Sequence, residues 1–244
     1  MNNIIEALHA RKSTRAFERS PVLAAHKEAI LRAAAAAPTP GNQQMYTIID
    51  VTDQALKNTL AVSCDNQPFI AAAPMVLIFV ADCQKWYDAY RHAGIDAHRP
   101  GPGDLALAIT DASIAAQNAV VAAESLGIGS CYIGDIFEQC EMHRSLFNLP
   151  PYAVPAAMLV LGYPTEAQKA RQKPARFDQK HIVHENGYRH MDADELKEML
   201  QKRAGSRAYE EWLTAFHTRK YGADYAREMN RSVAEYLRAF LFGR

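Results

Sequence analysis

The 244 residues include 27 basic and 27 acidic side chains, and 49% of them are apolar. A chain of this length and apolar content can bury one sizeable core, with room for a second small module. Because the formal net charge is zero, we do not expect a nucleic-acid-binding protein, whose contacts to phosphate normally leave a basic face.

The cysteines and the first residues bear on the compartment in which the chain works. Cys64, Cys83, Cys131 and Cys140 form no CxxC pattern and lie within apolar segments. We interpret them as reduced thiols, not as a disulfide framework or a zinc site. The first three residues lack the charged and apolar regions of a signal peptide. No apolar run approaches the ~20 residues that cross a bilayer. We therefore expect a cytoplasmic protein.

In chain order, the sequence first predicts an Ala-rich helix over 22–37, which Pro38 and Pro40 end. β-Branched or continuously apolar residues indicate strands over 46–51, 74–80, 130–136 and 153–161. Helices are expected between them, over 53–62, 82–92 and 104–126. The helix over 104–126 is apolar around almost its whole circumference, which is typical of burial in a large core or in a subunit interface.

Beyond residue 163 the composition changes. Residues 164–190 are polar and irregular, and a loop of this length in a compact domain is functional or wraps a partner. Helical periodicity then returns as two amphipathic stripes, one through Trp212 and one through Tyr236. We therefore predict a core with its long loop over 1–190 and a helical extension over 191–244.

The order of the elements limits the fold class. Strands do not alternate strictly with crossover helices, and no G-x-G-x-x-G motif follows the first strand. These features disfavour a Rossmann dinucleotide-binding domain. We predict an α+β protein with a central, mixed and mostly antiparallel sheet flanked by helices. The sequence also has no G-x-S-x-G or H-E-x-x-H motif, so we assign no catalytic nucleophile and no metal ligand.

The first candidate site residues are Arg11, Ser13 and Arg15, which alternate within the segment 11–17. An extended backbone would send these three side chains to the same side. Guanidiniums and a hydroxyl suit the oxygens of a phosphate monoester, which accept several charge-assisted hydrogen bonds. The alternative is a solvated basic edge without a ligand.

Four further segments carry residues that bind ligands. Amides at 42–44 and 66–67 could donate to and accept from a polar heterocycle. Glycines within 125–134 let backbone N–H groups approach a flat ring closely. The long loop adds Lys173 and Arg176 and is followed by His184-Glu185-Asn186-Gly187-Tyr188.

Taken in order and spacing from about residue 4 to 190, these segments resemble the FMN-dependent nitroreductase family, in its branch of NADPH nitroreductases and flavin reductases. The family's RxSxRxF motif is met by Arg11, Ser13, Arg15 and Phe17. The segment 123–134 is similar to the flavin-facing segment of the family. Narrower matches to the branch lie at 66–68, 161–164 and 184–188.

The resemblance implies a nitroreductase-like fold and a homodimer that binds FMN at the subunit interface. The helix over 104–126 would form the dimer core, and the helices after residue 190 would pack on the dimer. NADPH or NADH would supply hydride in a ping-pong cycle, and the acceptors would be nitroaromatics, quinones or flavins. Two alternatives stay open: a specialised reductase of this fold, such as a dehalogenase or a ferredoxin-linked enzyme, and a protein that binds FMN without turnover.

The resemblance also implies roles for single residues. Arg11, Ser13 and Arg15 would bind the FMN phosphate, with Lys173 and Arg176 reaching it from the long loop. The pyrimidine, the ribityl chain and the isoalloxazine pocket would be contacted by Lys12, Asn66, Gln67, Asn42 and Gln44.

Two further sets of residues complete the predicted site. Backbone N–H groups around Tyr132, Ile133 and Gly134 would face flavin N5 and O4. Arg203 and Arg207, beyond the part that matches clearly, are candidates for the 2′-phosphate of NADPH.

The chain departs from the branch at two places near the predicted flavin. Asp135 stands where a second glycine often follows the Tyr-Ile-Gly triplet, and a carboxylate aimed at the flavin would lower its potential. Met45 replaces a proline that is common elsewhere in the family, in a turn that is often Ser-rich. The acceptor side of the pocket is therefore expected to be unusual.

Overall fold

A computed structural model describes residues 2–243, and its contacts divide the chain into two units. The core unit comprises the residues up to 171 and those from 228 onward. The insertion unit comprises residues 172–227, so it interrupts the core unit in the sequence. The sequence prediction drew its single boundary at residue 190 instead. The packing of the last helices on a dimer stays a prediction.

The centre of the core unit is a four-stranded sheet. Its strands are β1 (Tyr46–Asp50), β2 (Met75–Asp82), β3 (Gly129–Ile133) and β4 (Ala153–Gly162), arranged in the order β1-β2-β4-β3. Every neighbouring pair is antiparallel. All of β4 and all but the last residue of β2 are buried, because these two strands are apolar on both faces. The predicted α+β class is confirmed.

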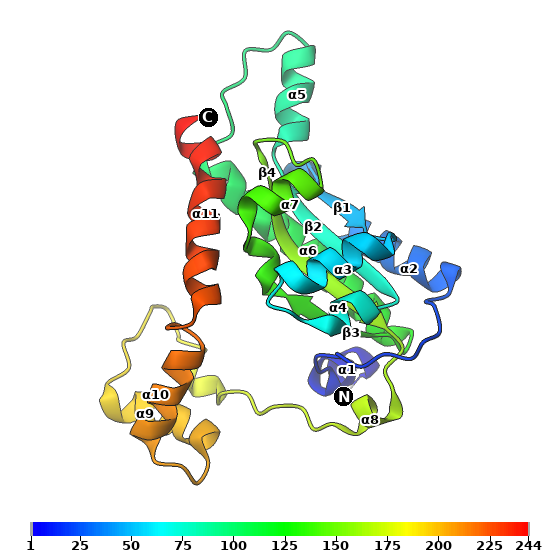
Figure 1. Cartoon of the computed structure of the whole chain (residues 1–244). Coiled ribbons are helices and arrows are strands. Elements are labelled where there is room, and N and C mark those ends of the chain that lie inside the picture. Colours follow the sequence, from blue (N-terminus) through cyan, green and yellow to red (C-terminus); the bar gives the residue numbers. More distant parts are fainter. Residues whose placement is uncertain (1, 244) are drawn as a thin grey trace. The chain divides into compact units, whose positions relative to one another are not determined.

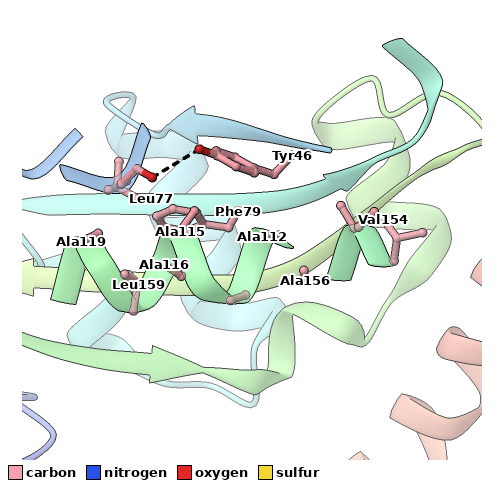
Figure 2. Close-up of a cluster of buried hydrophobic side chains, with 14 of the residues drawn as sticks. Tyr46, Leu77, Phe79, Ala112, Ala115, Ala116, Ala119, Val154, Ala156 and Leu159 are labelled. Atoms are coloured by element: carbon pink, nitrogen blue, oxygen red, sulfur yellow. Dashed lines mark hydrogen bonds between the residues drawn. The ribbon is translucent and has the colours of Figure 1, made fainter. Parts of the chain in front are cut away.

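One face of the sheet is covered by α6 (Pro102–Ser125) and α2 (Ala24–Ala35). Figure 2 shows alanines of α6 against Leu77 and Phe79 of β2 and Leu159 of β4. Because alanine side chains are small, the helix backbone can approach the sheet closely. Tyr46 fixes α2 to the sheet edge, since its hydroxyl donates to the carbonyl oxygen of Ala34 at 3.2 Å.

The helix α6 is the predicted long apolar helix. By length and composition alone it could cross a membrane, which differs from the expectation that no run is long enough. In this fold it packs on β2, β4 and α2, and nine of its residues are buried. Leu107 and Ile114 remain exposed to 50% and 37%. We conclude that α6 is a core helix with one uncovered apolar edge.

The opposite face of the sheet carries α3 (Gln54–Ser63), α4 (Pro68–Ala72) and α7 (Cys140–Leu146). Figure 1 shows α3 and α4 on one side of the strands and α6 on the other. The two faces follow the alternation of β4, whose Met158 and Val160 join the second cluster while Leu159 and Leu161 join the first. The sheet is therefore the middle layer between helices.

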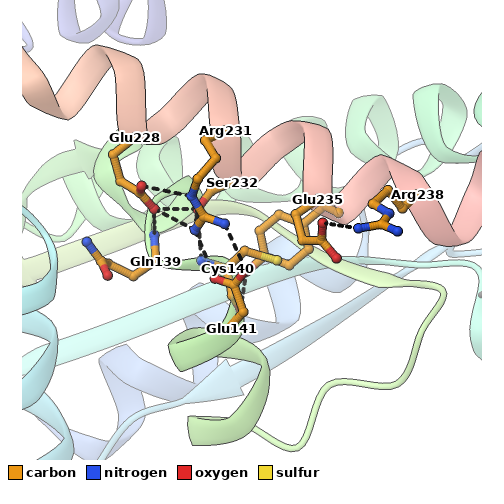
Figure 3. Close-up of polar contacts among 9 residues, drawn as sticks. Gln139, Cys140, Glu141, Glu228, Arg231, Ser232, Glu235 and Arg238 are labelled. Atoms are coloured by element: carbon orange, nitrogen blue, oxygen red, sulfur yellow. Dashed lines mark hydrogen bonds and ion pairs between the residues drawn. The ribbon is translucent and has the colours of Figure 1, made fainter.

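The helix α11 (Asp224–Phe242) brings the chain back to the core unit. Tyr236 and Phe240 are buried in the first cluster, where Phe240 meets Tyr152 edge-on at 5.5 Å between ring centroids. Polar contacts fasten α11 to the start of α7 (Figure 3). Glu228 accepts from the backbone N–H of Gln139 at 3.1 Å, and Ser232 Oγ accepts from the N–H of Cys140 at 2.9 Å.

The remaining elements of the core unit are short. They are α1 (Asn3–Ala10), the 3-10 turns η1 (Pro40–Asn42) and η2 (Gly134–Phe137), α5 (Gln84–His92) and α8 (Glu166–Ala170). The insertion unit contains η3 (Gln179–His181), α9 (Ala193–Ala204) and α10 (Tyr209–Arg219). The predicted strand over 130–136 was too long, because the chain turns into η2 at Gly134. The helices α4 and α7 were not predicted.

Candidate functional site

The segment 11–17 runs in an extended conformation beside β3 and the end of β4. Thr14 N donates to Ser130 O at 2.9 Å, and Phe17 forms a β-bridge with Pro164. Thr14 is buried against the sheet, where a Cβ on Gly129 would lie 2.3 Å from its Oγ1. Glycine at 129 is therefore what lets the segment lie this close to the strand.

Because Thr14 points into the protein, its neighbours Ser13 and Arg15 point to the other side. Both meet the thiol of Cys131. Burial raises the pKa of this thiol, while the charges of Arg15 and Arg11 and hydrogen bonds from Ser13 and Arg15 act to lower it. Ser13 and Arg15 therefore meet at Cys131, and the charge of Arg11 acts on the same thiol.

Arg11 is the C-cap residue of α1 and has spare hydrogen-bonding capacity. Its Nη2 donates to Ser130 Oγ at 3.5 Å, a long hydrogen bond. Its Nε is buried and has no hydrogen-bond partner within the described residues. A buried N–H without an acceptor is costly, so an oxygen ligand at this position would be stabilised.

Gln168 of α8 holds the backbone of the segment, and the sequence prediction missed it. Its side chain, only 2% exposed, accepts from the Arg15 backbone N–H and donates to the Ser13 carbonyl, each at 3.2 Å. The carbonyl oxygen and the NH2 group of this amide thus each form a hydrogen bond with a residue that flanks Thr14. Gln168 is a positioning residue for Ser13 and Arg15.

Lys12 ties the same segment to the residues after α8. Its Nζ donates to the carbonyl oxygens of Lys169 and Arg171, at 2.5 and 2.6 Å. The predicted contact of Lys12 with the flavin pyrimidine stays a prediction, and the geometry adds a second role for this ammonium group. It fixes the chain directly before residue 172, where the insertion unit begins.

Residues 65–67 turn the chain from α3 into α4. Asp65 and Asn66 both adopt positive φ, and the side chain of Asn66 is exposed. Gln67 Nε2 donates to Cys64 O at 2.9 Å and to Asp135 Oδ2 at 2.7 Å. Gln67 therefore contacts the residue that directly follows the predicted segment 132–134. Arg15 adjoins α4, since its guanidinium lies 5.8 Å from the ring centroid of Phe69.

The end of β3 presents its backbone beside these side chains. Ile133 is buried, whereas Gly134 is exposed and begins η2. Tyr132 is 37% exposed and its hydroxyl donates to Gln117 Oε1 of α6 at 3.3 Å. Burial raises the pKa of Tyr132 to about 12, so its phenol remains protonated at neutral pH.

Asn42 and Gln44 lie in the turn between α2 and β1. Both have positive φ and exposed side chains, and Gln44 Nε2 donates to Ala35 O at 3.0 Å. The turn rests on Asp111 of α6, a fully buried residue whose Oδ2 accepts from Thr39 Oγ1 and from Met45 N at 2.7 Å each. Asp111 was not predicted, because an acidic residue in an apolar helix gives no motif.

The basic residues predicted from the long loop and the tail belong to the insertion unit. Lys173 is half-buried and Arg176 is exposed. The guanidinium of Arg203 stacks on the ring of Phe177, 3.8 Å from its centroid, and Arg207 is exposed. Their contacts with an FMN phosphate and an NADPH 2′-phosphate stay predictions.

The residues assembled in the core unit fit FMN. Ser13 and Arg15 point to one side of the extended segment, the charge of Arg11 acts on the same thiol, and Arg11 Nε lacks an acceptor among the described residues. Such a donor set suits a phosphate monoester. The exposed backbone at Gly134 and the amide of Gln67 supply the polar groups that a flavin ring and its ribityl chain require.

Comparisons with known proteins agree with this geometry. Residues 8–163 match the model of the nitroreductase family. The FMN reductase [NAD(P)H] of Bacillus subtilis is 30% identical over 97% of this chain and 91% of its own length. The oxygen-insensitive NADPH nitroreductase of Salmonella typhimurium is 35% identical over 79% of this chain and 77% of its own.

A solved structure extends the likeness to the fold. The NADPH:FMN oxidoreductase from Vibrio harveyi complexed with NAD+ superposes with a TM-score of 0.82, at 26% identity, over 97% of this chain and 98% of that one. The match to the family model covers more than half of the chain and includes the extended segment 11–17. This chain belongs to the nitroreductase family.

Proposed function

We propose that this protein is an FMN-dependent oxidoreductase that takes hydride from NAD(P)H and reduces nitroaromatics, quinones or flavins. The observation that carries the proposal is the meeting of Ser13 and Arg15 at Cys131, beside an Arg11 whose buried Nε has no acceptor among the described residues. The activities for which the B. subtilis, S. typhimurium and V. harveyi proteins are named support the same reaction class.

In this proposal the chain's residues bind and orient the cofactor. Arg11, Ser13 and Arg15 hold the phosphate, and Gln168 keeps the latter two in place through their backbone. Gln67 and the backbone N–H groups after Ile133 orient the ring. When bound, FMN supplies the hydride chemistry itself, so no acid–base pair is required of the protein.

The protein is proposed to act as a cytoplasmic homodimer. The exposed edge of α6, with Leu107 and Ile114, supports the dimer because an uncovered apolar edge favours association. Tyr132 lies against the same helix through Gln117, so the flavin segment and this edge are neighbours. Asn42 and Gln44, in a turn that rests on α6, are proposed to line the ring pocket.

The experiment is a visible spectrum of the freshly purified protein, repeated without oxygen after addition of NADPH and then of NADH. We expect a yellow protein that bleaches with at least one of them. A yellow protein that resists both would contradict NAD(P)H as the donor and favour the FMN-binding protein without turnover. A colourless protein that takes up no added FMN would overturn the proposal.

A further inference from the structure

The side-chain amide of Gln67 has no free donor. An amide nitrogen carries two hydrogens, and Gln67 Nε2 directs them to Cys64 O and to Asp135 Oδ2. What Gln67 can still offer to a ligand is its carbonyl oxygen, which only accepts hydrogen bonds. The orientation of this amide therefore decides which groups of a flavin it can recognise.

Asp135 is itself held by a second carboxyl group, that of Glu138. Glu138 follows η2 and is only 4% exposed. Burial, together with the charge of Asp135 and a hydrogen bond to it, raises the pKa of Glu138 to about 8. This shift favours the protonated form of Glu138, which can donate its O–H to Asp135.

The charges that act on Glu138 are acidic, and the cation next to them, Arg231, is paired with Glu228 and Glu141. Asp65 faces it from the turn before α4, and Glu228 faces it from α11. The thiol of Cys64, the C-cap of α3, lies close by, and burial raises its pKa to about 12. His143 of α7 stays neutral, because burial lowers its pKa. A second negative charge on the pair would therefore be unfavourable.

We propose that Asp135 and Glu138 are positioning residues that fix the Gln67 amide, so that it presents only an acceptor to FMN. This proposal rests on the proposed function. The group that Gln67 recognises is then a donor of FMN, either a ribityl hydroxyl or the ring N3–H. Loss of the Glu138 proton sets two carboxylates against each other, and the arrangement that holds Gln67 is lost.

The test is the affinity of the apoprotein for FMN, measured by quenching of FMN fluorescence at pH 7 and pH 9. For the unmodified protein we expect affinity about tenfold weaker at pH 9, since binding requires a group with a pKa near 8. Glu138→Gln should abolish this pH dependence, because an amide N–H donates to Asp135 at either pH. Asp135→Asn should abolish it as well, because the pair can then carry only one charge.

A matched control keeps the test specific. Glu235→Gln makes the same chemical change on α11, at a carboxylate paired with Arg238, and should retain the tenfold difference. If Glu138→Gln retains it too, or the unmodified protein shows none, the inference is wrong.

A further variant separates this inference from the proposed function. Arg15→Ala should weaken FMN binding at pH 7. Suppose that it does, and that the ratio of FMN affinities at pH 7 and pH 9 is the same in the unmodified protein and in the other variants. Then only the positioning role of Asp135 and Glu138 fails. If Arg15→Ala binds FMN as tightly as the unmodified protein, the proposed phosphate site itself fails.

Discussion

Arg231 of α11 places Nη1 and Nη2 each 2.8 Å from one oxygen of the Glu141 carboxylate on α7 (Figure 3). The same guanidinium contacts Glu228, one turn earlier on α11, at 2.8 Å. Hydrogen bonds from Arg231 lower the pKa of both Glu141 and Glu228 to about 2. Arg231 thus fastens α11 to α7 through Glu141, while its contact with Glu228 lies within α11.

This arrangement predicts how stability depends on pH. The folded-state pKa of each carboxylate lies below its ordinary value of 4.5, so the stabilisation is complete above pH 4.5 and is lost as pH falls toward 2. Arg231→Ala should lower the melting temperature by about 2–4 °C at pH 7 and by little at pH 2. Thermal melts followed by circular dichroism measure both. Arg238→Ala, which breaks a single pair with Glu235, is the control and should have the smaller effect.

Arg15→Ala removes a charged donor that we assign to the FMN phosphate. Hydrogen bonds to charged groups contribute about 1.5–3 kcal/mol, so FMN affinity should fall about 10- to 100-fold without unfolding the apoprotein. Titration of apoprotein with FMN measures the change. Arg19→Ala, a basic and exposed position four residues later, should leave the affinity unaltered. Equal losses in the two variants would argue for a general effect of charge and against a phosphate contact.

Gly129→Ala tests the close approach of the extended segment to β3. The added Cβ would lie 2.3 Å from Thr14 Oγ1 and 2.8 Å from Thr14 Cβ, so the segment must move. We expect a loss of about 1–3 kcal/mol in the free energy of unfolding, as in other overpacked sites, and weaker FMN binding. Gly103→Ala is the control, since no atom lies within 4 Å of its added Cβ. Urea denaturation measures the free energy of unfolding of both variants. Equal values for the two variants would contradict the steric argument.

Ile114→Asp tests the proposed dimer. A charge on the uncovered edge of α6 should oppose association, because it would be buried without a partner in the interface. Sedimentation at micromolar concentration should give a dimer for the unmodified protein and a monomer for the variant. Val62→Asp places the same charge at an exposed apolar position of α3 and should leave the dimer intact. A monomeric unmodified protein would refute the dimer directly.

The sequence predicted the sheet well because its strands are strong signals. The strands β2 and β4 are buried on both faces, so their apolar runs stand out against the polar turns around them. The helices α4 and α7 escaped prediction for the opposite reason. They have five and seven residues, too few to show a helical period, and α7 follows Gln139 in a left-handed conformation without a side-chain cap.

The candidate site likewise contains residues that the sequence could predict and residues that it could not. Arg11, Ser13 and Arg15 could be found from spacing, because their geometry follows from the local extended backbone. Gln168 and Glu138 could not. Gln168 acts on a carbonyl 155 residues away, and the environment of Glu138 is made by η2, α3 and α11 together. Contacts that depend on the closed tertiary structure leave no periodic trace in the sequence.

The position of α11 has a consequence for the order in which the chain can fold during its synthesis. Tyr236 and Phe240 complete the cluster that also contains Tyr152, yet they follow the insertion unit in the sequence. Until residue 240 has left the ribosome, the side of Tyr152 that packs on Phe240 has no cover. The insertion unit can therefore be made in full while the core unit is still open, and that nascent surface is the one we expect a chaperone to protect.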